Sequence, residues 1–276
     1  VRSGTIVPGH DLAADRLAVI ADKTGVSIRG AGTLSGAGFD VAWRQDAAPE
    51  ARGTSSVTGS VELSRAFLSA FGLNLPDGAV RGEGRGEIAL DLVRGEPTRY
   101  RLTSGLAGLA MAIPSLGWSK PAEAQGRLDV SGVLERPATV ESLELEAAGL
   151  SLSGAVTMAP DGRFEAASFP EVSLGGWFEG AVELRGRGAG QPAAIAITSG
   201  SADLTGVSLG SGGQATTRSG PISVTLDQLR VSEGIRLTRF RGDFTNEGGL
   251  SGRFTGLVNG EAPVSGAMVP MIIEAP

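Results

Sequence analysis

The stretch Ser142-Leu143-Glu144-Leu145-Glu146 alternates apolar and polar residues, and the alternation returns at 181–185 (Ala-Val-Glu-Leu-Arg) and 222–227 (Ile-Ser-Val-Thr-Leu-Asp). Successive side chains of a β-strand point to opposite faces, so each stretch has one apolar and one polar face. The pattern continues along almost the whole chain between glycine-rich turns, and it predicts roughly twenty short strands. We therefore expect an all-β protein, built as a long twisted antiparallel sheet with one apolar face.

Composition supports this fold class and limits what the apolar face contains. The chain has 276 residues, of which 43 are glycine, and 41% are hydrophobic, too many for a disordered chain. Glycine shows no three-residue period, which excludes collagen. Aromatic residues make up only 5%, with Tyr100 as the single tyrosine. The apolar face is therefore expected to consist of Leu, Val, Ile and Ala.

The alternation also predicts where the strands run. The predicted strands cover residues 16–21, 25–29, 39–44, 55–63, 86–93, 99–104, 106–113, 126–134, 140–148, 150–158, 163–169, 171–175, 177–186, 193–199, 201–209, 221–227, 229–232, 235–244, 250–258 and 263–269. Gly30, Gly32, Gly36 and Gly38 are expected in the turns between the early strands. Trp43 and Trp177 lie in strand-like segments and are expected on the apolar face.

One segment has a helical period instead. Apolar residues recur at the spacing of one helix face at Leu63, Ala66, Phe67, Ala70 and Phe71. Ser64 can cap the N-terminus, and Gly72 stands where a left-handed C-cap belongs. This predicts one short helix near 65–71, which needs tertiary packing to persist.

A weak repeat of glycine, aliphatic, serine, aliphatic occurs at 25–28, 149–152 and 206–209. Its unequal spacing favours an antiparallel meander over a β-helix of fixed period. We expect residues 1–276 to form one continuous segment of a larger protein, or alternatively to divide into 1–121 and 122–276. Val1 follows no signal peptide, so a targeting or anchoring segment is expected elsewhere in the parent chain.

Charge and residue counts argue against several classes of function. The net charge is −6, from 30 acidic and 24 basic residues with no basic run, so we expect no nucleic-acid partner. Zero cysteines exclude disulfides, zinc–thiolate sites and thiol catalysis. No apolar run is long enough for a spanning helix.

Catalytic and metal motifs find little support either. His10 is the only histidine, in a turn-like Pro-Gly-His-Asp stretch, and no nucleophile elbow is present. Glu144 and Glu146 alternate with leucines and are interpreted as the solvent side of a strand. The Gly-rich stretches 82–86 and 186–190 lead into strands or turns, not into the helix that a phosphate-binding loop requires. We expect a protein that is not an enzyme and has no catalytic residues, no cofactor and no metal.

Trp118 and Lys120 lie between two prolines, in Leu116-Gly117-Trp118-Ser119-Lys120-Pro121. One interpretation is a packed turn with an exposed lysine. The other is a corner that positions two segments of the sheet.

Three stretches carry a family resemblance. Residues 100–121 (Tyr-Arg-Leu-Thr-Ser-Gly-Leu-Ala-Gly-Leu-Ala-Met-Ala-Ile-Pro-Ser-Leu-Gly-Trp-Ser-Lys-Pro) resemble the middle region of the large AsmA-like envelope proteins, especially the YhdP branch. Residues 61–72 and Leu75-Pro76 fit the same region. Residues 242–256, followed by Val258-Asn259-Gly260 and Pro263-Val264, look like the AsmA-like C-terminal region. The resemblance covers most of the chain.

The resemblance implies a fold and a function. Family members are anchored in the inner membrane of Gram-negative bacteria and extend through the periplasm. They form a long twisted β-sheet with an open apolar groove, of the repeating β-groove type, that conducts phospholipid to the outer membrane. The implied partners are phospholipid acyl chains and a membrane anchor supplied by another part of the parent chain.

Elementary energetics agree with such a role. Each methylene removed from water is worth about 0.8 kcal/mol, so a 16-carbon chain exposed to water costs roughly 12 kcal/mol. A carrier must shield the acyl chains from water along their whole path. A uniform aliphatic strip does this without any one position that binds the chain so tightly that it stops moving. The candidate groove residues are the alternating aliphatics Leu143, Leu145, Val182, Leu184, Ile222, Val224 and Leu226, some of which could instead pack on the helix. The alternative is a structural β-sandwich or β-helix stalk, as in an adhesin or scaffold, whose apolar faces bury each other.

Overall fold

The computed structural model describes residues 2–3, 12–70, 78–113, 118–135, 138–188, 190–206, 220–246 and 250–269. The chain divides into two compact units. Unit 1 comprises residues 1–112, 119–148 and 158–162, and unit 2 comprises residues 113–118, 149–157 and 163–276. His10 lies outside the described residues.

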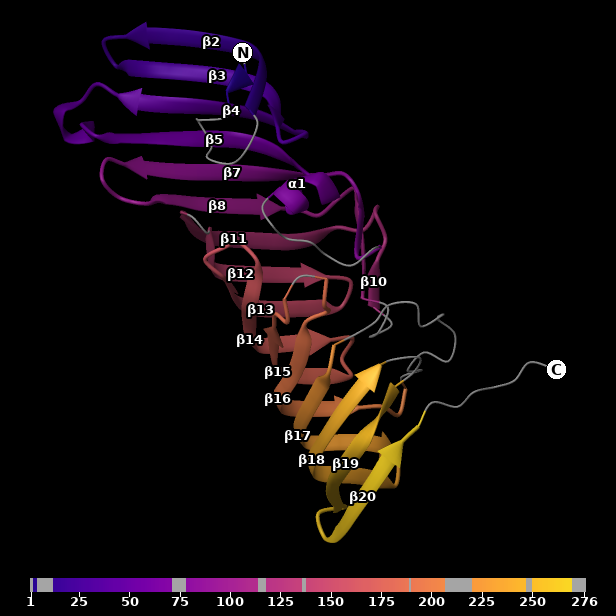
Figure 1. Ribbon diagram of the computed structural model, residues 1–276. Helices are drawn as coiled ribbons and strands as arrows, with labels where there is room; N and C mark the ends of the chain where they lie inside the picture. The colour runs from indigo at the N-terminus through magenta and orange to yellow at the C-terminus, as the bar shows by residue number, and fades with distance from the viewer. Residues whose placement is uncertain are drawn as a thin grey trace. The chain divides into compact units, whose positions relative to one another are not determined.

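In unit 1, eight strands pair with their neighbours, and each pairing is antiparallel (Figure 1). In spatial order they are β2 (Leu12–Asp22), β3 (Gly25–Leu34), β4 (Ala37–Asp46), β5 (Thr54–Leu63), β7 (Gly84–Val93), β8 (Thr98–Ser104), β11 (Gly126–Leu134) and β12 (Thr139–Ala147). The two-residue strand β1 (Arg2–Ser3) pairs with Leu12 and Ala13 at the start of β2. β2 is therefore the outermost long strand of this unit.

Small elements lie beside these strands. A 3-10 turn, η1 (Pro49–Ala51), connects β4 to β5, and the helix α1 (Arg65–Ala70) follows β5 directly. A small sheet contains β6 (Val80–Gly82), β9 (Leu109–Ile113) and β10 (Trp118–Lys120). The Ser64 hydroxyl accepts a hydrogen bond of 3.3 Å from the Phe67 amide, so the predicted N-cap is confirmed. Phe71 and the predicted C-cap Gly72 lie outside the described residues.

In unit 2 the strands are β13 (Leu150–Met158), β14 (Phe164–Leu174), β15 (Phe178–Arg185), β16 (Ala194–Asp203), β17 (Ile222–Ser232), β18 (Ile235–Asn246), β19 (Leu250–Val258) and β20 (Ala262–Met268). The pairs from β14 to β16 and from β17 to β20 are antiparallel. β16 and β17 pair in parallel, so the prediction of a purely antiparallel sheet is wrong at this pair. The all-β prediction with one short α-helix is confirmed for the described residues, which form mainly a large mixed sheet.

Several predicted strand ends are wrong because strands continue through bulges and glycines. β14 runs through Pro170, where a register shift lets the strand bend without ending. β16 and β17 likewise continue where the sequence predicted breaks near Gly200 and Gln228.

The structure also corrects the positions expected for three glycines and one tryptophan. Gly30 and Gly32 lie inside β3 and Gly38 inside β4, whereas Gly36, with φ of 91°, occupies the turn. Trp43 lies in β4 as expected, but Trp177 lies in the turn before β15, where its amide bonds to Leu174.

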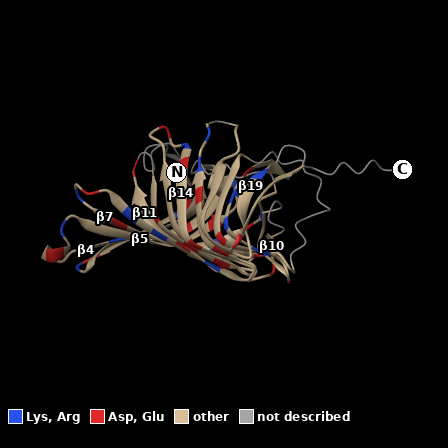
Figure 2. Ribbon diagram, turned by 90° about the horizontal axis from the view of Figure 1, so that it is seen from below, with Lys and Arg blue, Asp and Glu red and all other residues tan. Residues whose placement is uncertain are grey.

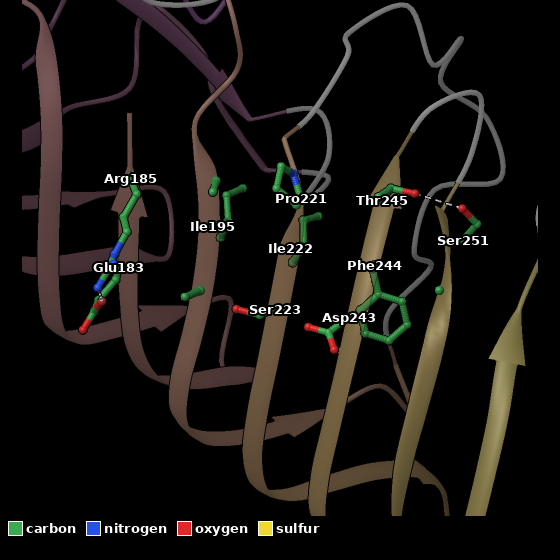
Figure 3. Close-up of a pocket in the computed structure, with 13 residues that line it drawn as sticks. Glu183, Arg185, Ile195, Pro221, Ile222, Ser223, Asp243, Phe244, Thr245 and Ser251 are labelled. Atoms are coloured by element: carbon green, nitrogen blue, oxygen red, sulfur yellow. Dashed lines mark hydrogen bonds and ion pairs between the residues drawn. The ribbon is translucent and has the colours of Figure 1, made fainter. Parts of the chain in front are cut away.

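The strands of unit 2 bend near their middles. Register shifts interrupt β14–β15 between Phe169 and Val172, β15–β16 between Ala181 and Val182, and β18–β19 between Thr238 and Arg241. Arg239 has a φ of 51°, a conformation that L-residues rarely adopt. A bulge bends its strand and increases the local twist, and Figure 3 shows these strands curving.

Candidate functional site

One face of unit 2 is apolar across seven neighbouring strands. Directly paired residues of neighbouring strands share a face. Leu184 pairs with Ile195, Ile195 with Ile222, and Ile222 with Phe244, which forms one row across four strands. A second row runs from Phe169 through Val182, Ile197 and Val224. We call the following set the unit 2 apolar face: Ala167, Phe169, Val182, Leu184, Ile195, Ile197, Ile222, Val224, Leu226, Phe240, Phe244, Phe254 and Met268.

Glycines let aromatic rings lie flat on this face. Gly252 pairs with Phe244, and Gly266 pairs with Phe254. A Cβ at Gly266 would lie 2.6 Å from Cζ of Phe254, so the ring occupies the space above that glycine. Phe254 also stacks on Phe240, with centroids 5.6 Å apart and planes at 27°. Few aromatics are present, but the expectation that the face contains only Leu, Val, Ile and Ala is wrong.

Unit 1 has a comparable face. Leu143 pairs with Val130, Val130 with Leu102, and Leu102 with Ile88. Leu145 pairs with Leu128 in the adjacent row. The set that we call the unit 1 apolar face is Leu17, Val19, Ile28, Phe39, Val41, Trp43, Val57, Val61, Ile88, Leu90, Tyr100, Leu102, Leu128, Val130, Leu143 and Leu145.

All seven sequence-predicted groove residues lie on these two faces. Leu143 and Leu145 belong to unit 1, and the other five belong to unit 2. Leu145 and Leu226 are buried, and the remaining five are half-buried. The sequence missed the phenylalanines, although the spacing Gly242-Asp-Phe244 and Gly252-Arg-Phe254 places a glycine and a ring on one face two residues apart.

The small sheet and α1 pack on one part of the unit 1 apolar face, where the Leu109 side chain of β9 lies against Gly84 of β7. The extensive contacts between described elements join neighbours within a sheet, apart from those of α1 with β5 and β6. Near α1, the residues Val61, Leu63, Phe67 and Val80 are buried. Elsewhere the faces are mainly half-buried, and at β2 Leu17 and Val19 are 52% and 66% exposed.

Charged residues of both signs are interspersed along the strands (Figure 2). The register places Glu87, Asp129 and Glu144 of unit 1, and Glu183 and Asp243 of unit 2, on the face opposite the apolar one.

Ion pairs join Arg101 of β8 with Asp129 of β11, and Arg127 of β11 with Glu144 of β12. Arg99 of β8 reaches across β11 to Glu141 of β12. The Arg101 Nε donates to Oδ1 of Asp129 at 3.0 Å, and this bonding lowers the pKa of Asp129 although burial opposes it. Along the paired rows of both apolar faces the residues are uncharged, and Glu165, two residues before Ala167 at the start of β14, is a charged residue at the margin of the unit 2 face.

Tyr100 is the polar exception on the unit 1 apolar face. Its phenol donates a 3.1 Å hydrogen bond to the Thr139 carbonyl. Burial, with a smaller contribution from the negative charge of Glu141, raises the pKa of Tyr100 to about 12. The phenol therefore stays neutral at physiological pH and adds no charge to the face.

Lys120 is buried, 1% exposed, which corrects the interpretation of an exposed lysine in a turn. Its ammonium donates to the carbonyls of Leu106 and Leu109, each at 2.8 Å, and of Pro121 at 3.1 Å. Burial lowers the pKa of Lys120, while the charge of Glu123 opposes the shift. With three acceptors for three N–H donors, the side chain fastens the segment around Leu106 to β10.

A pocket of about 500 Å³ lies over one end of β15–β19 (Figure 3). Ile195, Ile222 and Phe244 line it together with polar residues that include Arg185 and Asp243. Arg185 lies 3.5 Å from Glu183, but both side chains are solvent-exposed enough that the pair is weak. The row Glu183, Ala196, Ser223 and Asp243 in this pocket lies on the face opposite the unit 2 apolar face.

The described residues contain no group of three or more His, Cys, Asp or Glu that could hold a metal ion. Across those residues, no helix has the length and apolar character needed to cross a membrane.

Comparison with known proteins gives no relative: no family model, no curated protein and no solved structure matches this chain.

Proposed function

We propose that the two apolar faces bind the acyl chains of phospholipid, and that the protein is a periplasmic segment of a bridge that passes phospholipid between inner and outer membranes. The observation that carries the proposal is an apolar face in each unit whose side chains are mostly half-buried, although α1 and the small sheet pack on one part of it in unit 1. The resemblance to AsmA-like envelope proteins supplies the periplasmic location and the anchor in the parent chain.

The composition of the faces suits a sliding ligand. Aliphatic side chains follow one another from strand to strand, and rings that lie over glycines leave few protruding groups. A site for one defined ligand would need several convergent polar groups. An acyl chain instead gains about 0.8 kcal/mol per buried methylene wherever it lies along such a face.

The polar headgroup needs a neighbouring place in water. At the ends of β15–β19, Arg185 and Asp243 lie on the face opposite Ile222 and Phe244, so charged groups stand across the strand ends from the unit 2 apolar face (Figure 3). An amphiphile whose tail lies on the unit 2 apolar face could keep its headgroup at this end.

The alternative function is a structural stalk or scaffold without lipid. In a β-sandwich two sheets bury each other's inner faces. The half-buried side chains that make up most of both apolar faces favour lipid binding over that alternative.

The decisive experiment places a photo-crosslinking amino acid at Val224 or Leu145 of the chain expressed in the periplasm of a Gram-negative bacterium. Matched controls are Thr225 and Glu144, which are the next residues along the same strands and face the other side. We expect phospholipid adducts, read by mass spectrometry, at Val224 and Leu145 and few at the controls. Adducts to protein alone at Val224 and Leu145 would remove the lipid proposal and favour the scaffold.

A further inference from the structure

Three strands of unit 2 contain a β-bulge near their middles. β14 and β16 lie on either side of β15, and both depart from regular pairing next to Ala181. In β14, Pro170 and Glu171 together stand opposite Ala181, and in β16 the extra residue is Thr198. In β18 the irregular stretch includes Arg239, whose φ of 51° is rare for an L-residue.

The three bulges lie at one level of the sheet. The β16–β17 ladder keeps the same offset before and after the bulge, which makes Ser199 level with Leu226. Leu226 in turn pairs with Phe240, the residue next to Arg239. A bulge bends its strand, so bulges aligned across the strands crease the sheet along one line, and Figure 3 shows the strands of this unit curving.

The unit 2 apolar face continues beyond the crease. β15 has no extra residue, so Phe178, Gly180 and Val182 lie on one face of it. A Cβ at Gly180 would lie 3.1 Å from Cζ of Phe178, so the ring lies along this face. Directly paired residues then carry the face across five strands in a row that we call the corner row: Leu174, Phe178, Ala202, Leu229 and Leu237.

Burial differs on the two sides of the crease. Every residue of the corner row is at most 9% exposed. The rows on the other side of the β14 and β16 bulges are half-buried throughout. We call these the lane rows, and they comprise Phe169, Val182, Leu184, Ile195, Ile197, Ile222 and Val224.

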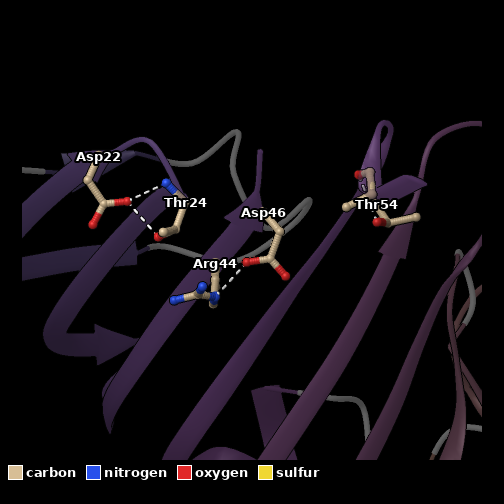
Figure 4. A network of polar contacts seen from close by, with 6 residues as sticks. Asp22, Thr24, Arg44, Asp46 and Thr54 are labelled. Atoms are coloured by element: carbon tan, nitrogen blue, oxygen red, sulfur yellow. Dashed lines mark hydrogen bonds and ion pairs between the residues drawn. The ribbon is translucent and has the colours of Figure 1, made fainter. Parts of the chain in front are cut away.

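Regularly paired strands of unit 1 have no such buried row at the end near Asp22. β3, β4, β5 and β7 pair without a register shift, and Val26 near the turn is 38% exposed. Polar contacts at this end are local: Oδ1 of Asp22 accepts a 2.7 Å hydrogen bond from the Thr24 amide, and Nε of Arg44 donates to Asp46 at 2.8 Å (Figure 4). The apolar row beside them stays half-buried, and it comprises Ile28, Trp43, Val57 and Leu90. The buried row of unit 2 thus accompanies the bulges.

The lane rows are longer across the strands than along them. Along one strand they span about 7 Å, the rise of two residues, before they reach the crease. Across the strands they continue from β14 to β17, roughly 14 Å at the usual spacing between strands. A long acyl chain therefore finds continuous apolar contact only when it crosses the strands.

From this geometry we infer that the aligned bulges position the acyl chains in unit 2. They close the corner row into the inner angle of the crease and leave the lane rows as the surface on which the chains lie, across the strands. Pro170, Thr198 and Arg239 are therefore positioning residues that act through the backbone and not by touching lipid. The inference rests on the proposed function, because it assigns a path to the lipid proposed there.

Single-cysteine variants test the path, because the chain contains no cysteine. The purified, delipidated chain is alkylated with N-ethylmaleimide, with and without vesicles of phosphatidylethanolamine and phosphatidylglycerol. We expect Val224→Cys to react readily and to be protected by the vesicles, and Leu229→Cys and Leu237→Cys to react slowly in both conditions. Thr225→Cys is the control, since Thr225 is exposed on the other face of β17 and should react quickly in both conditions.

The outcomes separate the path from the proposed function. Fast alkylation of Leu229→Cys and Leu237→Cys that lipid suppresses would overturn the path but leave lipid binding in place. Equal alkylation of Val224→Cys with and without lipid would overturn both, because the lane rows would then carry no lipid.

A second set of variants tests the positioning role of the bulges. Valine disfavours the φ of 51° at position 239, whereas glycine adopts it readily. In the Leu237→Cys chain, Arg239→Val should speed alkylation toward the rate of Val224→Cys and make it sensitive to lipid, and Arg239→Gly should leave it slow. Deletion of Thr198, the extra residue of β16, should have the same effect on Leu229→Cys as Arg239→Val has on Leu237→Cys.

Circular dichroism checks that each of these variants is folded. Slow alkylation at both corner positions in folded Arg239→Val and Thr198-deleted chains would overturn the positioning role. Faster alkylation without protection by lipid would also overturn it, because it would report a loss of stability and not a displaced path.

Discussion

Tyr100 reports on the unit 1 apolar face because it is the single tyrosine in the chain. Burial raises the pKa of Tyr100 to about 12, so its absorbance change near 295 nm should have a midpoint near pH 12 in the folded protein and near 10 in urea. Between these values the unfolded chain has lost the proton and the folded chain has kept it. The contribution of Tyr100 to the free energy of unfolding is therefore complete below pH 10 and is lost as pH rises toward 12. A folded-state midpoint near 10 would show that the phenol is exposed. The Tyr100→Phe variant, which contains no tyrosine, gives the background absorbance change.

Lys120 and Lys23 are the two lysines of the chain, and they differ in environment. Lys23 is exposed, whereas Lys120 is buried and donates to three carbonyls. Lys120→Met leaves those buried acceptors without their donor and should lower the free energy of unfolding by about 2 kcal/mol or more. Urea unfolding measures the change, and Lys23→Met should have almost no effect. Rapid acetylation of Lys120 in the folded protein would contradict its burial.

At the scale of the element, glycine and phenylalanine act as a pair. Gly266→Ala would place a Cβ 2.6 Å from Cζ of Phe254 and push the ring from its stack on Phe240. We expect a loss of about 1–3 kcal/mol in the free energy of unfolding, as for overpacking in a core. Gly234→Ala is the control, because nothing lies within 4 Å of a Cβ at that turn. Equal urea midpoints for the two variants would show that the ring does not depend on the glycine.

The elements also show which local features a sequence can predict. Alternation predicted most strands, and the Ser64 cap is confirmed by its bond to Phe67. Bulges at Pro170 and near Arg239 could not be predicted, because they depend on how a strand meets its neighbour's register. The parallel pairing of β16 with β17 is likewise set by a partner that local pattern does not identify.

At the scale of the whole molecule, the sequence predicts which residues face the apolar side of each strand. It does not predict which residues of neighbouring strands lie beside them. Alternation alone put Leu143, Val182 and Val224 on the apolar side of their strands. Which residues stand next to them is decided by cross-strand register, which brings Ile197 beside Val182 and Phe244 beside Ile222. The burial of each apolar-face residue also depends on segments distant in the sequence. Val61 and Leu63 are buried near α1 and β6, whereas Leu17 is 52% exposed.

Since each unit has its own apolar face, lipid capacity should divide between them. Leu143→Asp should reduce the phospholipid that co-purifies by roughly half, Val224→Asp should do the same, and the double variant should lose nearly all of it, because an ionised carboxylate on an apolar face opposes tail burial. Native mass spectrometry counts the bound lipid, and circular dichroism checks that each variant is folded. Ser142→Asp and Thr225→Asp are the controls, since these exposed residues face the other side of the same strands. Complete loss from one single substitution would show that the two faces do not bind independently, and full retention in the double variant would show that lipid lies elsewhere.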